Sequence, residues 1–126
     1  MRRSFPVLYV GDVAASVAFY SRLGFEEVYR FPPEGEAGYF SLRLGETQLG
    51  VVSKGWPEQD LGITVASSPR GELWVYVDDV DRAAEELRAE GFPVLREPRD
   101  MPWGERIAYV ADPDGNPVAL AGRRAA

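Results

Sequence analysis

The chain has 126 residues, 45% of them hydrophobic, and a net charge of −6, values typical of one globular domain of ordinary size. The acidic balance argues against a nucleic-acid partner, and no apolar run approaches the roughly 20 residues of a membrane span. The chain contains no histidine and no cysteine, which excludes the commonest metal ligands, thiol nucleophiles and a Ser-His-Asp triad. Because the N-terminus lacks the apolar region of a signal peptide, the expected location is cytoplasmic.

An internal repeat organises the chain. Residues 7–28 align without gaps on residues 74–95, and the agreement includes an Asp-Val pair and a Gly-Phe pair. The matched residues are Val10 with Val77, Asp12 with Asp79, Val13 with Val80, Gly24 with Gly91, and Phe25 with Phe92. Such self-similarity indicates a duplicated supersecondary unit. The alternative is a pair of unrelated strand–helix units with similar sequences.

The first half predicts one helix among several strands. A β-rich run indicates a strand over 5–10, after which Asp12 is placed to cap a helix and Gly24 to end it in a left-handed conformation. The apolar face expected for this helix comprises Val13, Val17 and Tyr20. Further strands are predicted at 26–31, 39–44 and 48–52, with a tight turn at Gly45 and Glu46.

The second half repeats this plan. A strand is predicted over 72–77, Asp79 is the expected cap, and Gly91 ends the helix. Its expected apolar stripe comprises Val80, Ala84 and Leu87. Further strands are predicted at 94–97, 106–111 and 117–121, the last two joined by the turn sequence DPDGN. Each half is therefore βαβββ, and the predicted fold is α+β, with tandem modules forming a curved mixed sheet around a cleft and helices on the outer face.

A stretch rich in Gly, Pro and Ser separates the two halves. We therefore expect a single domain over 1–126, with module one at 4–53, a connector at 54–71 and module two at 72–122. The connector contains Trp56.

Strand alternation separates an apolar sheet face, suited to lie under the helices, from a second face with aromatic and polar side chains. The predicted members of the second face are Phe5, Tyr9, Tyr39, Arg43, Gln48, Glu72, Trp74, Tyr76 and Tyr109. Trp103, in a Pro-Trp-Gly loop, is expected beside them. A mainly aromatic face with a few polar groups is typical of a ligand site, so we predict that these residues bind a ligand. The alternative is that they pack across a dimer interface or between the two half-sheets.

Several motifs now point to a known family. They are V-x-D-V at 10–13 and 77–80, FY-x-x-LGF at 19–25, and DPDGN-x-V at 112–118. Together with the tandem βαβββ plan, they resemble the vicinal oxygen chelate superfamily over residues 4–122. That superfamily includes glyoxalase I, extradiol dioxygenases and the bleomycin-resistance proteins. Because its scaffold hosts many activities, the resemblance predicts the fold better than the function.

The resemblance also bears on metal binding. Enzymes of the superfamily hold a divalent metal with His and Glu residues on the inward face, at positions that fall here on Phe5, Gly50, Glu72 and Ala119. Only Glu72 is a metal-binding residue type, so the resemblance implies no metal and no other cofactor. The chain is more similar in character to the metal-free bleomycin-resistance proteins, which are dimeric cytoplasmic binders with a PWG motif. By that likeness, Trp103 would stack on a planar ligand at the mouth of the cleft.

Three functional hypotheses follow, and the sequence leaves catalysis open. The first is metal-independent binding of a small molecule, such as a planar cationic antibiotic, with Glu72 as counter-charge. The alternative for Glu72 is a buried carboxylate paired with Arg43, and Arg43 would equally suit the carboxylate of an anionic ligand. The second is an enzyme of the superfamily with an atypical carboxylate site, in which Glu72 is a buried general base and Tyr39, Tyr76 or Tyr109 donates a proton. The third is a dimer or partner-contact protein in which Trp56 and the connector form the contact surface.

Overall fold

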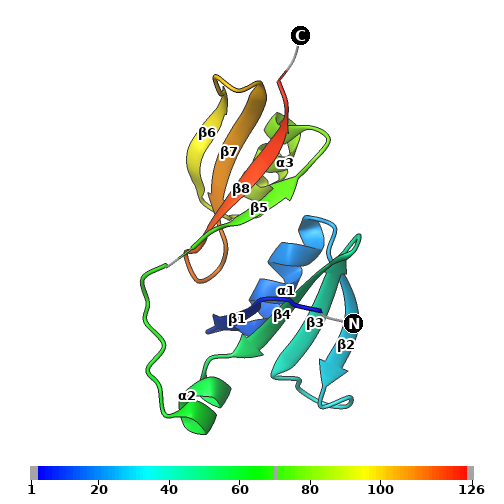
Figure 1. Ribbon diagram of the computed structural model, residues 1–126, viewed down its shortest axis with the longest axis vertical. Helices are drawn as coiled ribbons and strands as arrows, with labels where there is room; N and C mark the ends of the chain where they lie inside the picture. The colour runs from blue at the N-terminus through cyan, green and yellow to red at the C-terminus, as the bar shows by residue number, and fades with distance from the viewer. Residues whose placement is uncertain (1–2, 70, 125–126) are drawn as a thin grey trace. The chain divides into compact units, whose positions relative to one another are not determined.

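The computed structural model describes residues 3–69 and 71–124. The chain divides into two compact units, Met1–Ser67 and Ser68–Ala126, each with a sheet and a long helix against one face of it (Figure 1). The first unit comprises β1 (Val7–Val10), α1 (Val13–Arg22), β2 (Glu26–Phe31), β3 (Tyr39–Leu44), β4 (Thr47–Ser53) and α2 (Gly55–Leu61). The second unit comprises β5 (Leu73–Tyr76), α3 (Val80–Ala89), β6 (Val94–Asp100), β7 (Glu105–Ala111) and β8 (Pro117–Arg123).

The sheets of the two units have the same topology. The strand order is β1-β4-β3-β2 in the first unit and β5-β8-β7-β6 in the second. In each sheet the first strand pairs in parallel with the last, and the other pairs are antiparallel. Parallel neighbours need a crossover connection, and α1 and α3 lie on these connections. The predicted α+β fold with two βαβββ modules is confirmed.

Both long helices begin at the predicted aspartates. Asp12 Oδ1 accepts a hydrogen bond from the N–H of Ala15 at 3.0 Å, and Asp79 Oδ1 accepts one from the N–H of Arg82 at 3.1 Å. Each carboxylate thereby satisfies a backbone donor of the first helical turn. The glycines that follow the helices are Gly24 (φ +100°) and Gly91 (φ +93°). The helix boundaries in the repeat are therefore set by local capping.

The buried face of α1 differs from the predicted one. Its buried residues are Ser16, Phe19 and Tyr20, whereas Val13 and Val17 are only half-buried. The rings of Phe19 and Tyr20 meet edge-on with centroids 4.9 Å apart, so the aromatic side chains occupy the core and the valines flank it. The predicted stripe of α3 is confirmed, with Val80, Ala84 and Leu87 all buried.

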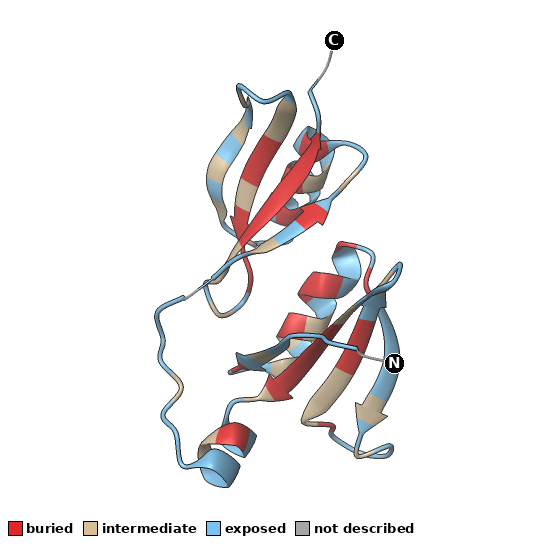
Figure 2. Cartoon of the chain, viewed as in Figure 1, coloured by how far each residue is buried: buried red, intermediate tan, exposed pale blue. Residues whose placement is uncertain are grey.

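Two strands begin later than the sequence predicts, and three, β4, β6 and β8, end later. Phe5 precedes β1 and Glu72 precedes β5, although both were expected within strands. β6 and β8 run on to Asp100 and Arg123. Figure 2 shows the buried residues gathered in the central strands of each sheet, while β2 and β6 at the edges are largely exposed.

The stretch between the halves contains a helix, α2, that its composition did not indicate. Trp56 of α2 lies against Gly38, because a Cβ added to that glycine would lie 2.2 Å from Trp56 Cζ2. The Trp56 ring also meets the ring of Phe31 edge-on, with centroids 6.5 Å apart. The Glu58 carboxylate accepts a hydrogen bond from the N–H of Val65 at 3.0 Å. Trp56 is thus packed on the first unit rather than fully presented as a contact surface.

The DPDGN turn is organised by its first residue. Asp112 is buried, and its Oδ1 accepts hydrogen bonds from the N–H groups of Asp114 and Asn116 at 3.0 and 2.8 Å. Its Oδ2 accepts a third bond from the side-chain amide of Asn116 at 3.0 Å. Gly115 supplies the left-handed residue of the turn, with φ +84°. This carboxylate therefore has a structural role in the β7–β8 hairpin.

Among the described residues, no helix is long and apolar enough to cross a membrane.

Candidate ligand-binding surfaces

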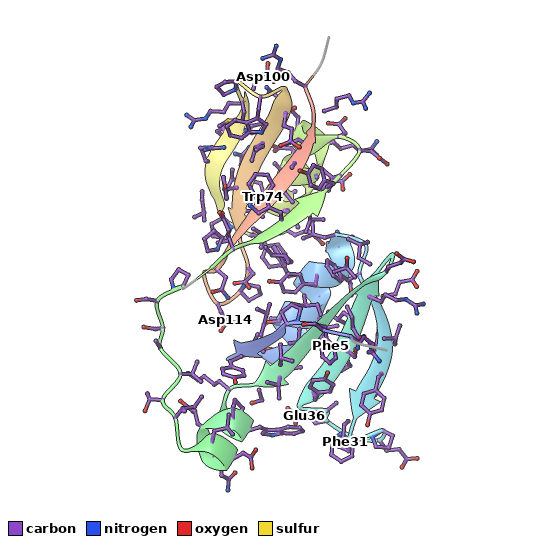
Figure 3. The ribbon with its side chains drawn as sticks, in the orientation of Figure 1. Phe5, Phe31, Glu36, Trp74, Asp100 and Asp114 are labelled. Atoms are coloured by element: carbon purple, nitrogen blue, oxygen red, sulfur yellow. The ribbon has the colours of Figure 1, made fainter. Side chains whose placement is uncertain are left out.

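The sheet face of the second unit that lies away from α3, here called its open face, has small residues at its centre and aromatic residues beside them. Trp74 of β5 and Tyr109 of β7 flank Ala119 of β8, and two residues further along the strands Tyr76 lies beside Ala121. Figure 3 labels Trp74 on the sheet of the second unit. Both alanines are fully buried, whereas the rings of Trp74 and Tyr76 are exposed and lie with centroids 6.5 Å apart. The two alanines form a small buried cluster with Ile107, and Met101 and Tyr109 pack against it. The face therefore presents the rings of Trp74 and Tyr76 to a ligand, and the alanines lie beneath the surface.

Glu105, at the start of β7, orients two of these rings. The indole Nε1 of Trp103 donates a hydrogen bond to Glu105 Oε1 at 2.8 Å. The Tyr76 hydroxyl is hydrogen-bonded to the same carboxylate, which raises the pKa of Tyr76. Trp103 is 60% exposed, so its side chain is not part of the hydrophobic core. The sequence interpretation missed Glu105, although strand alternation from Tyr109 places it on the open face.

Tyr109 is more enclosed than its neighbours. The guanidinium of Arg96 lies over its ring, 4.8 Å from the centroid, and Arg96 Nη2 lies 3.9 Å from Met101 Sδ. Burial raises the pKa of the Tyr109 hydroxyl, a hydrogen bond to Glu72 raises it further, and Arg96 opposes both. One face of this ring is therefore already covered by a cation. Glu72 itself is exposed, contrary to the burial that the enzymatic hypothesis requires of it.

The remaining predicted residues belong to the first unit. They are Phe5, Tyr9, Tyr39, Arg43 and Gln48. The β3–β4 hairpin has the predicted register, with Arg43 opposite Gln48 and Tyr39 opposite Val52. Tyr9 of β1 pairs with the same Val52, so Tyr9 and Tyr39 share the face away from α1, the open face of the first unit. Phe5 lies before β1, with the guanidinium of Arg3 5.6 Å from its ring centroid.

An open pocket of about 500 Å³ lies on the open face of the first unit. It is lined by three predicted residues, Tyr39, Arg43 and Gln48, and by four that were not predicted as site residues, Arg3, Val28, Tyr29 and Ser41. Tyr29 reaches this face because β2 contains a bulge between Glu27 and Tyr29, which places Tyr29 opposite Ser41 of β3.

The residues at the family's metal positions do not fit a divalent metal. A Cβ added to Gly50 would lie 2.9 Å from Val7 Cγ2 and 3.0 Å from the Tyr39 hydroxyl oxygen, so these side chains already fill the space of a ligating side chain. Ala119 is fully buried and Phe5 offers no donor atom. Within residues 3–69 and 71–124, no group of three or more Asp or Glu residues is placed to hold a metal ion.

The tandem βαβββ fold agrees with a family model that matches residues 4–120 and is described as the glyoxalase/bleomycin resistance protein/dioxygenase superfamily. The chain belongs to this superfamily. Several curated relatives are named lactoylglutathione lyase. The relative from Salmonella typhimurium is 30% identical over 128 residues, which cover 95% of this chain and 91% of that protein. The relative from Neisseria meningitidis serogroup A is 34% identical over 123 residues, covering 91% and 86%.

Solved structures of related enzymes share the fold of this chain. A glyoxalase-related enzyme from Fulvimarina pelagi aligns with a TM-score of 0.80 and 28% identity, over 98% of this chain and 89% of that one. A lactoylglutathione lyase from Agrobacterium tumefaciens aligns with a TM-score of 0.71 and 25% identity, over 95% and 92%.

Proposed function

We propose that the protein is a metal-independent small-molecule binding protein whose ligand is a planar cation. The observation that supports this most directly is the group of exposed rings on the open face of the second unit, Trp74, Tyr76 and Trp103, two of them hydrogen-bonded to Glu105. Aromatic faces attract cations, and a neighbouring carboxylate adds opposite charge. The net charge of −6 further favours the approach of a cation.

A flat cationic antibiotic has both the ring system and the charge that this surface would accommodate. Each aromatic contact contributes about 0.5–1.5 kcal/mol beyond burial, so a few rings and one carboxylate are enough for specific binding without chemistry. Sequestration of such a compound by a cytoplasmic homodimer is the physiological role we propose. It is supported by the resemblance to the metal-free bleomycin-resistance proteins and by the residues at the family's metal positions.

A lactoylglutathione lyase is the second candidate, because the curated relatives at 30–34% identity bear that name. The residues at the family's metal positions argue against a metal-dependent lyase. Glycine, alanine and phenylalanine occupy three of the four family metal positions, and the space at Gly50 is filled by Val7 and Tyr39. Whether binding requires a metal therefore separates the two candidates.

Replacing Trp103 by alanine is expected to weaken binding of acridine orange, a planar cation, by about tenfold, because stacking and cation–π attraction to the indole are lost. Glu105→Gln is expected to weaken binding several-fold, since the amide oxygen can still accept the indole N–H but the charge is gone. Both affinities are measured by titration of the dye's own fluorescence.

Trp56→Ala is the matched control, because it removes a partly exposed tryptophan from the first unit and should leave the affinity unchanged. Acridone, an uncharged planar ring system, tests the requirement for charge and is expected to bind weakly. Saturable dye binding with the same affinity in the wild type, Trp103→Ala and Glu105→Gln proteins would exclude the second unit's open face as the site.

A further inference from the structure

The pocket on the open face of the first unit has a charge opposite to that of the protein as a whole. Two guanidinium groups, those of Arg3 and Arg43, line it, and no carboxylate does. This is unexpected in a chain with 20 acidic and 14 basic residues. The nearest acidic strand neighbour is Glu26, opposite Arg43 across the β2–β3 pair, and it does not line the pocket.

Neither arginine is neutralised by the fold. Among the described residues, no ion pair involves Arg3 or Arg43, whereas other arginines do form them, such as Arg88 with Glu85 and Arg106 with Asp81. Arg43 is exposed at the pocket, with its planar donor group available to a ligand. A guanidinium that is not paired with a protein carboxylate can donate two parallel hydrogen bonds to the carboxylate of a ligand.

A short chain of hydrogen bonds positions the other arginine. Arg3 donates to Gln48 Oε1, and Gln48 Nε2 donates to Ser41 Oγ at 2.7 Å. Ser41 is buried in β3, so this relay links the arginine to the rigid centre of the sheet. Gln48 is thereby oriented with its acceptor toward Arg3 and its donor toward the strand.

The apolar side of the pocket consists of Val28 and the rings of Tyr29 and Tyr39. The rings of Tyr29 and Tyr39 have centroids 6.2 Å apart and planes inclined at 60°, and the Tyr39 hydroxyl reaches over Gly50. Such a wall packs against the flat hydrocarbon part of a ligand whose charged end meets the arginines.

We propose that this pocket binds an aromatic carboxylate, with Arg43 and Arg3 at its carboxylate group and Tyr29 and Tyr39 against its ring. The charge preference is opposite to that of the second unit's open face, so this is a second binding site and does not rest on the proposed function. The probe is 2-naphthoate, with 2-naphthamide as the uncharged analogue of the same shape.

The test is titration of 2-naphthoate, followed by its fluorescence anisotropy, into the wild-type protein and three variants. Arg43→Gln is expected to weaken binding at least tenfold. Arg43→Lys is expected to weaken it less, because lysine keeps the positive charge but cannot donate two parallel hydrogen bonds as a guanidinium does. Arg82→Gln is the matched control, since it removes the same charge from an exposed position on α3 and should change nothing. The naphthamide is expected not to compete.

Equal affinities for naphthoate in Arg43→Gln and Arg82→Gln would overturn the proposal, as would the absence of saturable binding to the wild type. Competition by naphthamide, or by inorganic phosphate as effectively as by naphthoate, would refute an aromatic carboxylate as the ligand. Trp103→Ala should leave naphthoate affinity unchanged and Arg43→Gln should leave acridine orange affinity unchanged. Each site is thereby tested independently of the other.

Discussion

Replacing Asp112 by alanine is expected to lower the free energy of unfolding of the second unit by about 3 kcal/mol. The side chain is buried and accepts three hydrogen bonds, two from the N–H groups of Asp114 and Asn116 and one from the Asn116 amide. Its removal leaves the half-buried donors of Asp114 and Asn116 without these acceptors, and a donor left unsatisfied costs about 1–3 kcal/mol. Denaturant unfolding in a Trp56→Phe background measures this, because Trp74 and Trp103 then report on the second unit alone.

Two further variants calibrate this result. Asp112→Asn keeps one acceptor oxygen and is expected to lose about half as much stability. Asp12→Ala removes the cap of α1 and is expected to cost about 1 kcal/mol in the first unit. If Asp112→Ala cost less than Asp12→Ala, the turn would not depend on its first carboxylate as described.

Replacing Gly38 by alanine is expected to destabilise the first unit by about 2 kcal/mol and to displace Trp56. The added Cβ would lie 2.2 Å from Trp56 Cζ2 and 2.6 Å from Cε2, so the indole cannot keep its position. Displacement also removes the edge-on contact with Phe31. Tryptophan fluorescence in a Trp74→Phe, Trp103→Phe background is expected to shift to longer wavelength as the ring becomes exposed, and denaturant unfolding gives the stability.

Gly55→Ala is the matched control, because a Cβ added there meets nothing within 4 Å. The double variant Gly38→Ala, Trp56→Ala is expected to be less destabilised than the sum of the single changes, since the clash is then gone. Additive losses, or an unshifted spectrum for Gly38→Ala, would show that the Gly38–Trp56 contact does not fix α2.

Features encoded locally could be predicted from the sequence. Helix starts at Asp12 and Asp79 follow from capping, and the face on which Trp74 and Tyr76 lie follows from alternation along one strand. Both depend only on residues a few positions apart.

Features that depend on contacts between different elements of the fold could not be predicted from the sequence. The bulge before Tyr29 reverses the alternation in β2, and this brings the residue onto the open face of the first unit. The predicted apolar face of α1 is correct for Tyr20 and wrong for Val13 and Val17, which are half-buried while Ser16 and Phe19 are buried. The contact of Trp56 with Gly38 joins α2 to a distant loop, and no local pattern signals it.

If the protein binds a planar cation without a metal, its affinity for acridine orange does not depend on added metal. Acridine orange is titrated into protein dialysed against EDTA, and again after addition of excess zinc or nickel. We expect the same saturable binding curve after EDTA, with zinc and with nickel, because the residues at the family's metal positions provide one carboxylate and no other ligand. Binding that appears only after a metal is added would contradict metal-independent binding. Loss of binding when EDTA removes a stoichiometrically bound metal would contradict it as well.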